Sequence, residues 1–447
     1  MQDIDLLVQP RWLIPVQPEG LVLEHHAMAV RDGRIVAVLP ADEAVRQYRP
    51  AQSVELPDHA LLPGFVNLHT HAAMSLMRGL ADDLPLMRWL NEHIWPAEAA
   101  AVSEAYVADG TRLACAEFIR SGQTCFNDMY FFPETAADVI NETGMRAGLG
   151  LIVIDFPTVY ASDADDYLHK ALAAHDRLKG APHIHPVLAP HGPYTVSDAP
   201  LRKLRAYANE LGLPIHMHVH ETADEVQGQL AATGQRPLER LEALDLLDSD
   251  FIAVHMTQLT DDEIARVARY GMHVAHCPQS NLKLASGFCP VAKLLDAGVN
   301  VGIGTDGAAS NNDLDLLDEM RTAAMLAKAV AGQPSAVAAP RALTMATMGG
   351  ARALGIADEI GSLEAGKAAD FIAIDLSDIS TQPVYNPIAQ IVYSAARHQI
   401  TDTFVGGRAL MRRRQLLTVD GDAAVASAAR WQETLRTFMA HDRRDTA

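Results

Sequence analysis

The chain has 447 residues, of which 49% are hydrophobic, and it carries a formal net charge of −20. This length and composition suit one large domain beside a smaller one and exclude a disordered chain. The acidic charge disfavours binding to nucleic acid and to anionic membrane surfaces.

Three short strand-like segments open the chain, at residues 4–10, 21–30 and 34–40. The last two are separated by Arg-Asp-Gly at 31–33, a turn sequence that joins antiparallel strands. A β hairpin is therefore expected within the first 40 residues.

From residue 60 short apolar runs alternate with amphipathic helical patterns such as 197–212 and 260–271. The eight runs cover 60–71, 124–130, 146–155, 184–194, 213–221, 251–258, 272–281 and 300–308. Nearly continuous apolar strands that alternate with helices are typical of a parallel sheet covered on both faces. Eight such units predict a (β/α)8 barrel of the TIM type.

Two helical patterns follow, near 313–331 and 338–355. Strand-like patterns then occur again at 361–376 and 400–410. The sequence after about 420 looks helical. The predicted fold is α/β: a barrel over residues 61–361, with a small β-sandwich domain built from residues 1–60 and 362–447.

Polar residues stand at the ends of several predicted barrel strands. They are His69 and His71 after the first run, His191 after the fourth, His216, His218, His220 and Glu221 in the fifth, His255 in the sixth and Asp306 in the eighth. Barrel active sites form at the carboxyl ends of the strands, so these residues should converge. His69 and His71 also share one strand face, because alternate residues of a strand do so.

Imidazoles with one carboxylate predict a catalytic metal site, with zinc expected and iron or manganese as alternatives. A bound divalent ion would lower the pKa of water from 15.7 to about 7 and hold hydroxide at neutral pH. Glu221 would lie beside that water as a proton shuttle. A purely structural zinc is disfavoured, because it would need four closed protein ligands, usually with cysteine.

Other histidines are expected to be structural. His183 and His185 lie at the start of the fourth strand, the end of the barrel that serves stability. His220 is expected to support the metal ligands through a hydrogen bond. The same reading applies to His25, His26, His273 and His276.

Five motifs, in order, resemble the amidohydrolase superfamily, and more narrowly its deaminases and chlorohydrolases of purines and triazines. They are PGFVNLHTH, HMHVHET, HCPQSN, GIGTDG and GSLEAGKAADF. The resemblance implies His69, His71, His218 and Asp306 as metal ligands, Glu221 as proton carrier at the ring, and His255 as the residue that orients hydroxide. Asp306 would also accept a proton from the water.

Many members of that superfamily hold two metals, bridged by a carboxylated lysine at the end of strand four. This chain has APHGPY there, with His191 and no lysine. The departure favours one metal ion per chain, and deamination over hydantoin or dihydroorotate hydrolysis.

The segment MSLMRGLADDLPLMRWLNEHIWPAE resembles the 5-methylthioadenosine/S-adenosylhomocysteine deaminase branch. That resemblance implies that Trp89 packs on a nucleoside and that Glu98 binds the ribose hydroxyls. Arg146 and His191 also match substrate-contact positions, and Glu221 would contact the base.

The expected reaction is therefore zinc-dependent hydrolytic deamination at C6 of an adenine nucleoside, releasing ammonia and the inosine analogue. The expected substrates are 5′-methylthioadenosine and S-adenosylhomocysteine, with adenosine also accepted. The alternatives are a guanine deaminase, a triazine amino- or chlorohydrolase, and a non-catalytic scaffold on the same fold. Glu98 distinguishes a nucleoside deaminase from a guanine deaminase or a triazine hydrolase, because a free base or a triazine has no ribose diol for it to bind.

The four cysteines form no disulfide-rich spacing, and the first residues lack the pattern of a secretory signal. No stretch approaches the roughly 20 apolar residues that a membrane helix needs. We expect a cytoplasmic homo-oligomer whose partner is a small-molecule nucleoside, with neither nucleic acid nor membrane as a partner.

Overall fold

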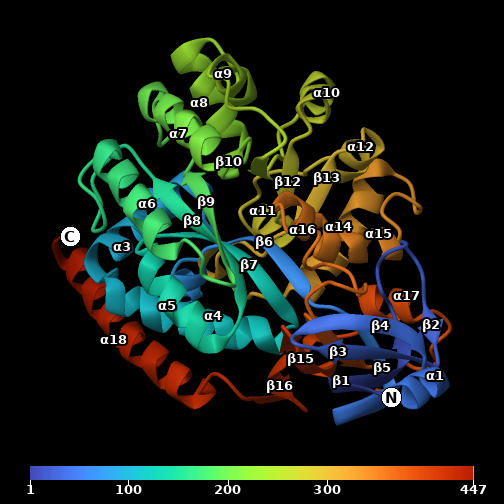
Figure 1. Ribbon diagram of the computed structural model, residues 1–447. Coiled ribbons are helices and arrows are strands. Elements are labelled where there is room, and N and C mark those ends of the chain that lie inside the picture. Colours follow the sequence, from blue (N-terminus) through green and yellow to red (C-terminus); the bar gives the residue numbers. More distant parts are fainter. Residues whose placement is uncertain (446–447) are drawn as a thin grey trace.

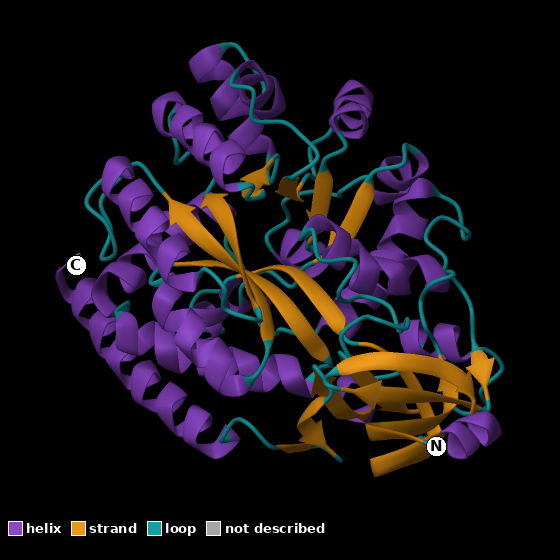
Figure 2. Ribbon diagram, viewed as in Figure 1, coloured by secondary structure: helices purple, strands orange, loops and turns teal. Residues whose placement is uncertain are grey.

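The computed structural model describes the backbone of residues 1–445 and the side chains of residues 1–438. A barrel of eight parallel strands stands beside a smaller β sheet, with helices around the barrel (Figures 1 and 2). The predicted α/β barrel with a small β domain is confirmed.

The barrel strands follow one another in chain order, each paired in parallel with the next. They are β6 (Phe65–Thr70), β7 (Gln123–Tyr130), β8 (Arg146–Val153), β9 (Ile184–Pro190), β10 (Ile215–Val219), β11 (Phe251–His255), β12 (His273–His276) and β13 (Asn300–Ile303). All eight coincide with the predicted apolar runs. Strands β7 and β8 are buried along their whole length, as strands covered on both faces should be.

Helices connect and cover these strands. Those before β10 are η1 (Ala72–Met77), α2 (Leu86–Trp89), η2 (Leu90–Ile94), α3 (Trp95–Ala101), α4 (Glu104–Arg120), α5 (Pro133–Thr143), α6 (Ala164–Leu178) and α7 (Asp198–Leu211). Those between β10 and the end of the barrel are α8 (Ala223–Thr233), α9 (Pro237–Ala243), α10 (Asp261–Tyr270), α11 (Pro278–Lys283), α12 (Val291–Asp296), α13 (Ala308–Asn311), α14 (Leu316–Ala331), α15 (Ala339–Thr344), η3 (Met345–Gly349) and α16 (Gly350–Ala353).

The remaining strands form one mixed, hydrogen-bonded sheet of nine strands. They are β1 (Gln2–Leu13), β2 (Leu23–Glu24), β3 (His26–Arg31), β4 (Arg34–Pro40), β5 (Tyr48–Pro63), β14 (Phe371–Asp375), β15 (Ile400–Val405), β16 (Arg408–Arg412) and β17 (Gln415–Leu416). The helices α1 (Ala41–Gln47), α17 (Pro387–Tyr393) and η4 (Arg397–Gln399) connect its strands. Strand β5 pairs with both β1 and β14, which joins the two ends of the chain in one sheet.

The hairpin predicted at residues 31–33 joins β3 to β4. Asp32 and Gly33 have φ of 52° and 74°, the left-handed values that a tight two-residue turn of this kind needs. Gly33 also lies against the backbone of Gly406, where a Cβ would come within 2.8 Å of the carbonyl oxygen. The turn is therefore fixed both by its own geometry and by the neighbouring loop.

The barrel closes between its first and last strands through the backbone. The Asp306 N–H donates to the His69 carbonyl oxygen at 3.0 Å. Gly304 makes this approach feasible, since a Cβ there would lie 2.9 Å from backbone atoms of His69. The glycines of GIGTDG therefore bring Asp306 next to the first-strand histidines.

The C-terminal helix α18 (Gly421–Asp445) runs along the barrel, across α4 (Figure 1). The Trp431 indole N–H donates to Asp109 at 3.0 Å, and its ring meets Tyr106 edge to face. Among the described residues no helix is both long and apolar enough to cross a membrane.

Candidate active site

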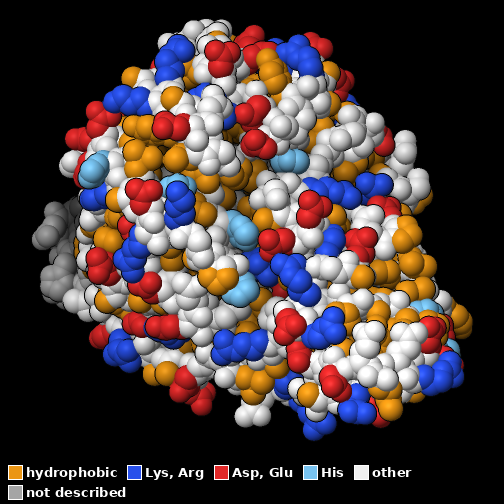
Figure 3. Space-filling model, in the orientation of Figure 1, with side chains coloured by type: hydrophobic (Ala, Val, Ile, Leu, Met, Phe, Trp, Pro, Cys, Tyr) orange, Lys and Arg blue, Asp and Glu red, His pale blue; other side chains and the backbone are white. Residues whose placement is uncertain are grey.

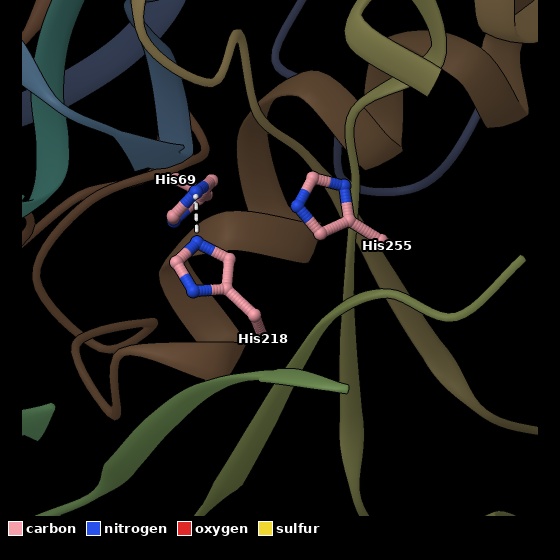
Figure 4. A group of neighbouring side chains, drawn as sticks. All are labelled: His69, His218 and His255. Carbon is pink, nitrogen blue, oxygen red and sulfur yellow. Dashed lines mark hydrogen bonds between the residues drawn. The ribbon is translucent and has the colours of Figure 1, made fainter. Parts of the chain in front are cut away.

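The strand ends bring four histidines and one aspartate together at one end of the barrel. His69 Nε2 lies 3.1 Å from His218 Nε2, and Asp306 Oδ1 lies 3.3 Å from Nε2 of both His69 and His71. The His255 ring is turned toward the same point (Figure 4). Donor atoms of these residues fall into two groups that share His69, each group within 4.8 Å, which is the spacing around one cation.

Hydrogen bonds at the far nitrogen orient two of these rings. His71 donates from Nδ1 to the Met129 carbonyl at 2.6 Å, and His218 donates from Nδ1 to the His191 carbonyl at 2.6 Å. In neutral rings both protons are then on Nδ1, so both Nε2 lone pairs point into the site. Each of these Nε2 atoms lies beside another donor atom, His69 Nε2 at 3.1 Å from His218 and Asp306 Oδ1 at 3.3 Å from His71, so the donor set fits a divalent metal ion.

Asp306 is held by three donors. Its Oδ1 accepts from the Gly307 N–H at 2.8 Å, and its Oδ2 accepts from the hydroxyls of Ser280 and Ser310 at 2.7 and 2.8 Å. Asp306 has φ of 59°, a left-handed conformation that aspartate adopts only at some cost. The neighbours thus hold a strained backbone that turns the carboxylate toward the histidines.

Glu221 stands on the loop after β10 and is nearly fully buried. Its carboxylate oxygen lies 3.8 Å from His255 Nε2, while Glu225 accepts hydrogen bonds from the backbone N–H groups of His220 and Glu221. Burial, together with the charge of Asp306, raises the pKa of Glu221 to about 8. A carboxyl group with that pKa holds its proton at neutral pH and can donate it.

A cavity of about 330 Å³ opens directly above these residues. Trp89, Glu98, His191 and Glu221, which the family resemblance implies as substrate contacts, all line it. Glu98 accepts a hydrogen bond from the Tyr130 hydroxyl at 2.8 Å, and burial raises the pKa of Glu98 to about 7 against the effect of that hydrogen bond. The volume suits a small-molecule ligand.

The prediction that Arg146 contacts substrate is wrong. Arg146 is the first residue of β8 and so lies at the opposite end of the barrel from the site. Its guanidinium is buried and pairs with Asp370 at 3.0 Å and with Glu359 at 3.5 Å. It joins the barrel to the segment that leads into β14.

The supporting role expected of His220 belongs to another histidine. His220 Nε2 accepts from the Leu238 N–H and lies 3.4 Å from Glu263, away from the metal-ligand candidates. His216 Nε2 instead lies 3.0 Å from Nδ1 of His69. His216, His218 and His220 alternate in the sequence, which predicts that they share one face of β10. Which of them contacts His69 on β6 depends on how far the barrel strands are shifted along one another.

Sequence reasoning missed several supporting side chains. They are Glu225, Ser280, Asn281 and Ser310, while His216 was singled out but given no supporting role. Asn281 accepts from His255 Nδ1 at 2.9 Å and so orients that ring. Ser280 and Asn281 lie in the motif HCPQSN. There the helix α11 begins directly after the end of β12, so the motif could have indicated that these two side chains lie at the site end of the barrel.

Comparison with known proteins gives a consistent picture. Residues 60–410 match the model of the Amidohydrolase family. A 5-methylthioadenosine/S-adenosylhomocysteine deaminase of Saccharophagus degradans is 48% identical over 96% of each chain, and one of Teredinibacter turnerae is 46% identical over 97% of this chain and 98% of its own. A crystal structure of an adenosine deaminase from Xanthomonas campestris with bound zinc superposes with a TM-score of 0.97, at 51% identity over 98% of this chain and 99% of the other.

Proposed function

The chain belongs to the amidohydrolase family, and from that premise we propose that it is a hydrolase that deaminates adenine nucleosides at C6. Its substrates are 5′-methylthioadenosine, S-adenosylhomocysteine and adenosine, and its products are ammonia and the corresponding inosine analogues. The relatives that cover nearly the whole chain support this assignment.

The observation that carries the proposal is the position of Glu221 and Glu98 in one cavity above the metal-ligand candidates. A protonated carboxyl group beside the metal site suits a ring nitrogen, and a second carboxylate at the wall suits the diol of a ribose. A free base or a triazine offers no diol, so Glu98 would keep its hydrogen bond from Tyr130 but would have no ligand hydroxyl to bind.

We assign the metal ligands to His69, His71, His218 and Asp306, with one zinc ion per chain. A zinc ion held by these residues would lower the pKa of a water molecule and so make it a nucleophile at neutral pH. Both groups of donor atoms found among the described residues share His69, which supports a single centre. No lysine lines the described cavity, so the bridging group of a two-metal site has no candidate here.

The protein residues then move the protons. Glu221 donates its proton to N1 of the ring, which lets C6 accept the incoming oxygen. His255, held by Asn281, fixes the direction of attack. Asp306 takes one proton of the attacking water and passes it to the exocyclic amine, which leaves as ammonia when the C6–N bond breaks. The second water proton, on the new C6 oxygen, returns to Glu221 as the C6=O bond forms.

The four cysteines are free and buried, which fits a reducing cytoplasm. Acidic and basic side chains are mixed over the face drawn in Figure 3, in keeping with a small-molecule partner. We retain the proposal of a homo-oligomer without assigning its interface.

A substrate screen tests the function. Ammonia release is measured with adenosine, 5′-methylthioadenosine, S-adenosylhomocysteine, guanine and melamine. Turnover of the adenine nucleosides alone is the expected result. Faster turnover of guanine or melamine would contradict the proposal, as would no turnover by protein that holds its metal.

A further inference from the structure

Glu319 is a buried carboxyl group that the proposed reaction does not use. It stands in the first turn of α14 and is fully buried. Burial, together with the charges of Asp313 and Asp318, raises the pKa of Glu319 well above its usual value, and no cation is among the described groups that shift this pKa. A buried carboxyl group without a cation destabilises a fold unless it is hydrogen-bonded, so packing alone does not explain a glutamate here.

The two oxygens of Glu319 hold two different segments. Oε2 accepts from the Gln279 N–H of α11 at 3.2 Å, and Oε1 accepts from the side-chain amide of Asn311 at the end of α13. Gln279 is held a second time, because its own side chain donates to Asp318 at 2.7 Å and to Thr322 at 3.0 Å. The start of α14 therefore fixes both α11, which packs against it (Figure 1), and α13.

The residues next to these two contacts are the ones that hold Asp306. Ser280 follows Gln279 on α11, and Ser310 precedes Asn311 on α13. Both serine hydroxyls donate to Asp306 Oδ2, at 2.7 and 2.8 Å. One carboxyl group thus holds the chain beside each of the two hydroxyls that orient the Asp306 carboxylate.

Two further hydrogen bonds extend the same arrangement. Asn281, the next residue of α11, accepts from His255 Nδ1 at 2.9 Å. Asn311 also donates to the carbonyl oxygen of Thr305, directly before Asp306, at 2.7 Å. The orientation of both His255 and Asp306 therefore depends on where α11 and α13 lie.

We infer that Glu319 is a positioning residue, which joins α11 to α13 and so fixes the two serines that orient the Asp306 carboxylate. Glu319 is not among the described residues that line the cavity, so it acts through the residues that it holds. Its expected effect on turnover rests on the proposed function. Its expected effect on metal binding rests only on the assignment of Asp306 as a metal ligand.

Zinc competition tests the inference without any assumption about the substrate. Glu319→Gln keeps the size of the side chain, but its amide nitrogen cannot accept a hydrogen bond and would face one of the two N–H donors. Residues that support metal ligands change metal affinity by about 10–100-fold, so we expect zinc to bind about tenfold more weakly in competition with a chelator. Unchanged zinc affinity would overturn the inference.

A double-mutant cycle separates positioning from a general weakening of the fold. Ser280→Ala/Ser310→Ala lacks the two hydroxyls through which Glu319 is inferred to act. Adding Glu319→Gln to this variant should therefore change zinc affinity by less than about twofold. The same tenfold loss in both backgrounds would show that Glu319 acts by another route, and would overturn the inference.

Turnover of adenosine gives a second measurement. In Glu319→Gln kcat should fall by about tenfold while KM changes by less than about twofold, because Asp306 moves a proton and is not assigned to substrate binding. Asp402→Asn is the control, at another buried carboxylate that pairs with Arg412 in the small sheet. It should lower the melting temperature but leave kcat and zinc affinity unchanged.

The outcomes distinguish the inference from the function. A fall of kcat in Asp402→Asn as large as that in Glu319→Gln would contradict a positioning role for Glu319. Parent protein that binds zinc but deaminates no adenine nucleoside would instead contradict the proposed function, and the zinc affinities would still decide the role of Glu319.

Discussion

The proposed role of Glu221 is to donate one proton to N1 of the substrate ring. Glu221→Gln keeps the size of the side chain and removes its acid, so kcat should fall by about 10²-fold or more with a smaller effect on KM. Steady-state kinetics, with metal content measured on the same sample, checks this. Loss of the metal in this variant would make Glu221 a ligand and would contradict its role as proton donor.

Glu98 is expected to act on binding of the sugar. Hydrogen bonds to a charged acceptor are worth about 1.5–3 kcal/mol, so Glu98→Ala should lower kcat/KM on nucleosides by about tenfold to a hundredfold. The 2′,3′-dideoxy analogue, which lacks both hydroxyls, serves as the control and should be nearly unaffected. Equal losses on both substrates would remove Glu98 from the ribose site.

His216 is expected to act through His69, which it contacts at 3.0 Å. Removing a partner of a metal-bound histidine lowers metal affinity by about 10–100-fold, so His216→Asn should lose zinc at lower chelator concentrations than the parent protein. His185→Asn, at the opposite end of the barrel, is the matched control. Identical chelator sensitivity in His216→Asn and the parent would show that the contact is only packing.

The sequence predicted candidate residues for the site but not all the side chains that contact them. His69 and His71 were found because two polar residues ended an apolar run, and Asp306 because it followed the last barrel strand. Whether His216 or His220 supports a ligand depends on the stagger between strands, which leaves no mark in one sequence. Arg146 was misplaced because a motif match ignored that it begins its strand rather than ends it.

At the scale of elements, local signals located the helices well. The pattern at 260–271 became α10, with a capping box between Thr260 and Glu263 and a left-handed Gly271 after its last residue. The pattern at 197–212 became α7, which ends at Gly212 in the same way. Such caps form hydrogen bonds to the free backbone groups at helix ends and depend only on nearby residues. The helix ends can therefore be predicted from the sequence without knowledge of the tertiary structure.

The Arg146–Asp370 pair joins two elements, β8 and the loop before β14. Arg146→Met would leave the Asp370 carboxylate buried without its partner, which costs about 3–5 kcal/mol. The melting temperature should fall clearly while kcat/KM of the folded protein stays unchanged. The control is Arg177→Met, whose exposed pair with Asp138 contributes only about 0–1 kcal/mol. A loss of kcat/KM at constant melting temperature would restore Arg146 to the substrate site.

At the scale of the whole molecule, the division into a β domain (1–60 and 362–447) and a barrel (61–361) stays a prediction. The long strand β5 continues to Pro63, and a single residue, Gly64, separates it from the first barrel strand at Phe65, so there is almost no linker between the two parts. The helix α18 belongs to the β domain by sequence but packs on α4 of the barrel. The sequence pattern located the change from β segments to alternating strands and helices, but it did not indicate which surface the last helix covers.

The central claim is that one metal ion at the barrel end makes this chain a nucleoside deaminase. The most direct measurement is ammonia release from 5′-methylthioadenosine by protein stripped of metal and then titrated with zinc. The account predicts no turnover without metal and a linear recovery that stops at one equivalent per chain. Turnover by the stripped protein, or recovery that continues to two equivalents, would contradict it.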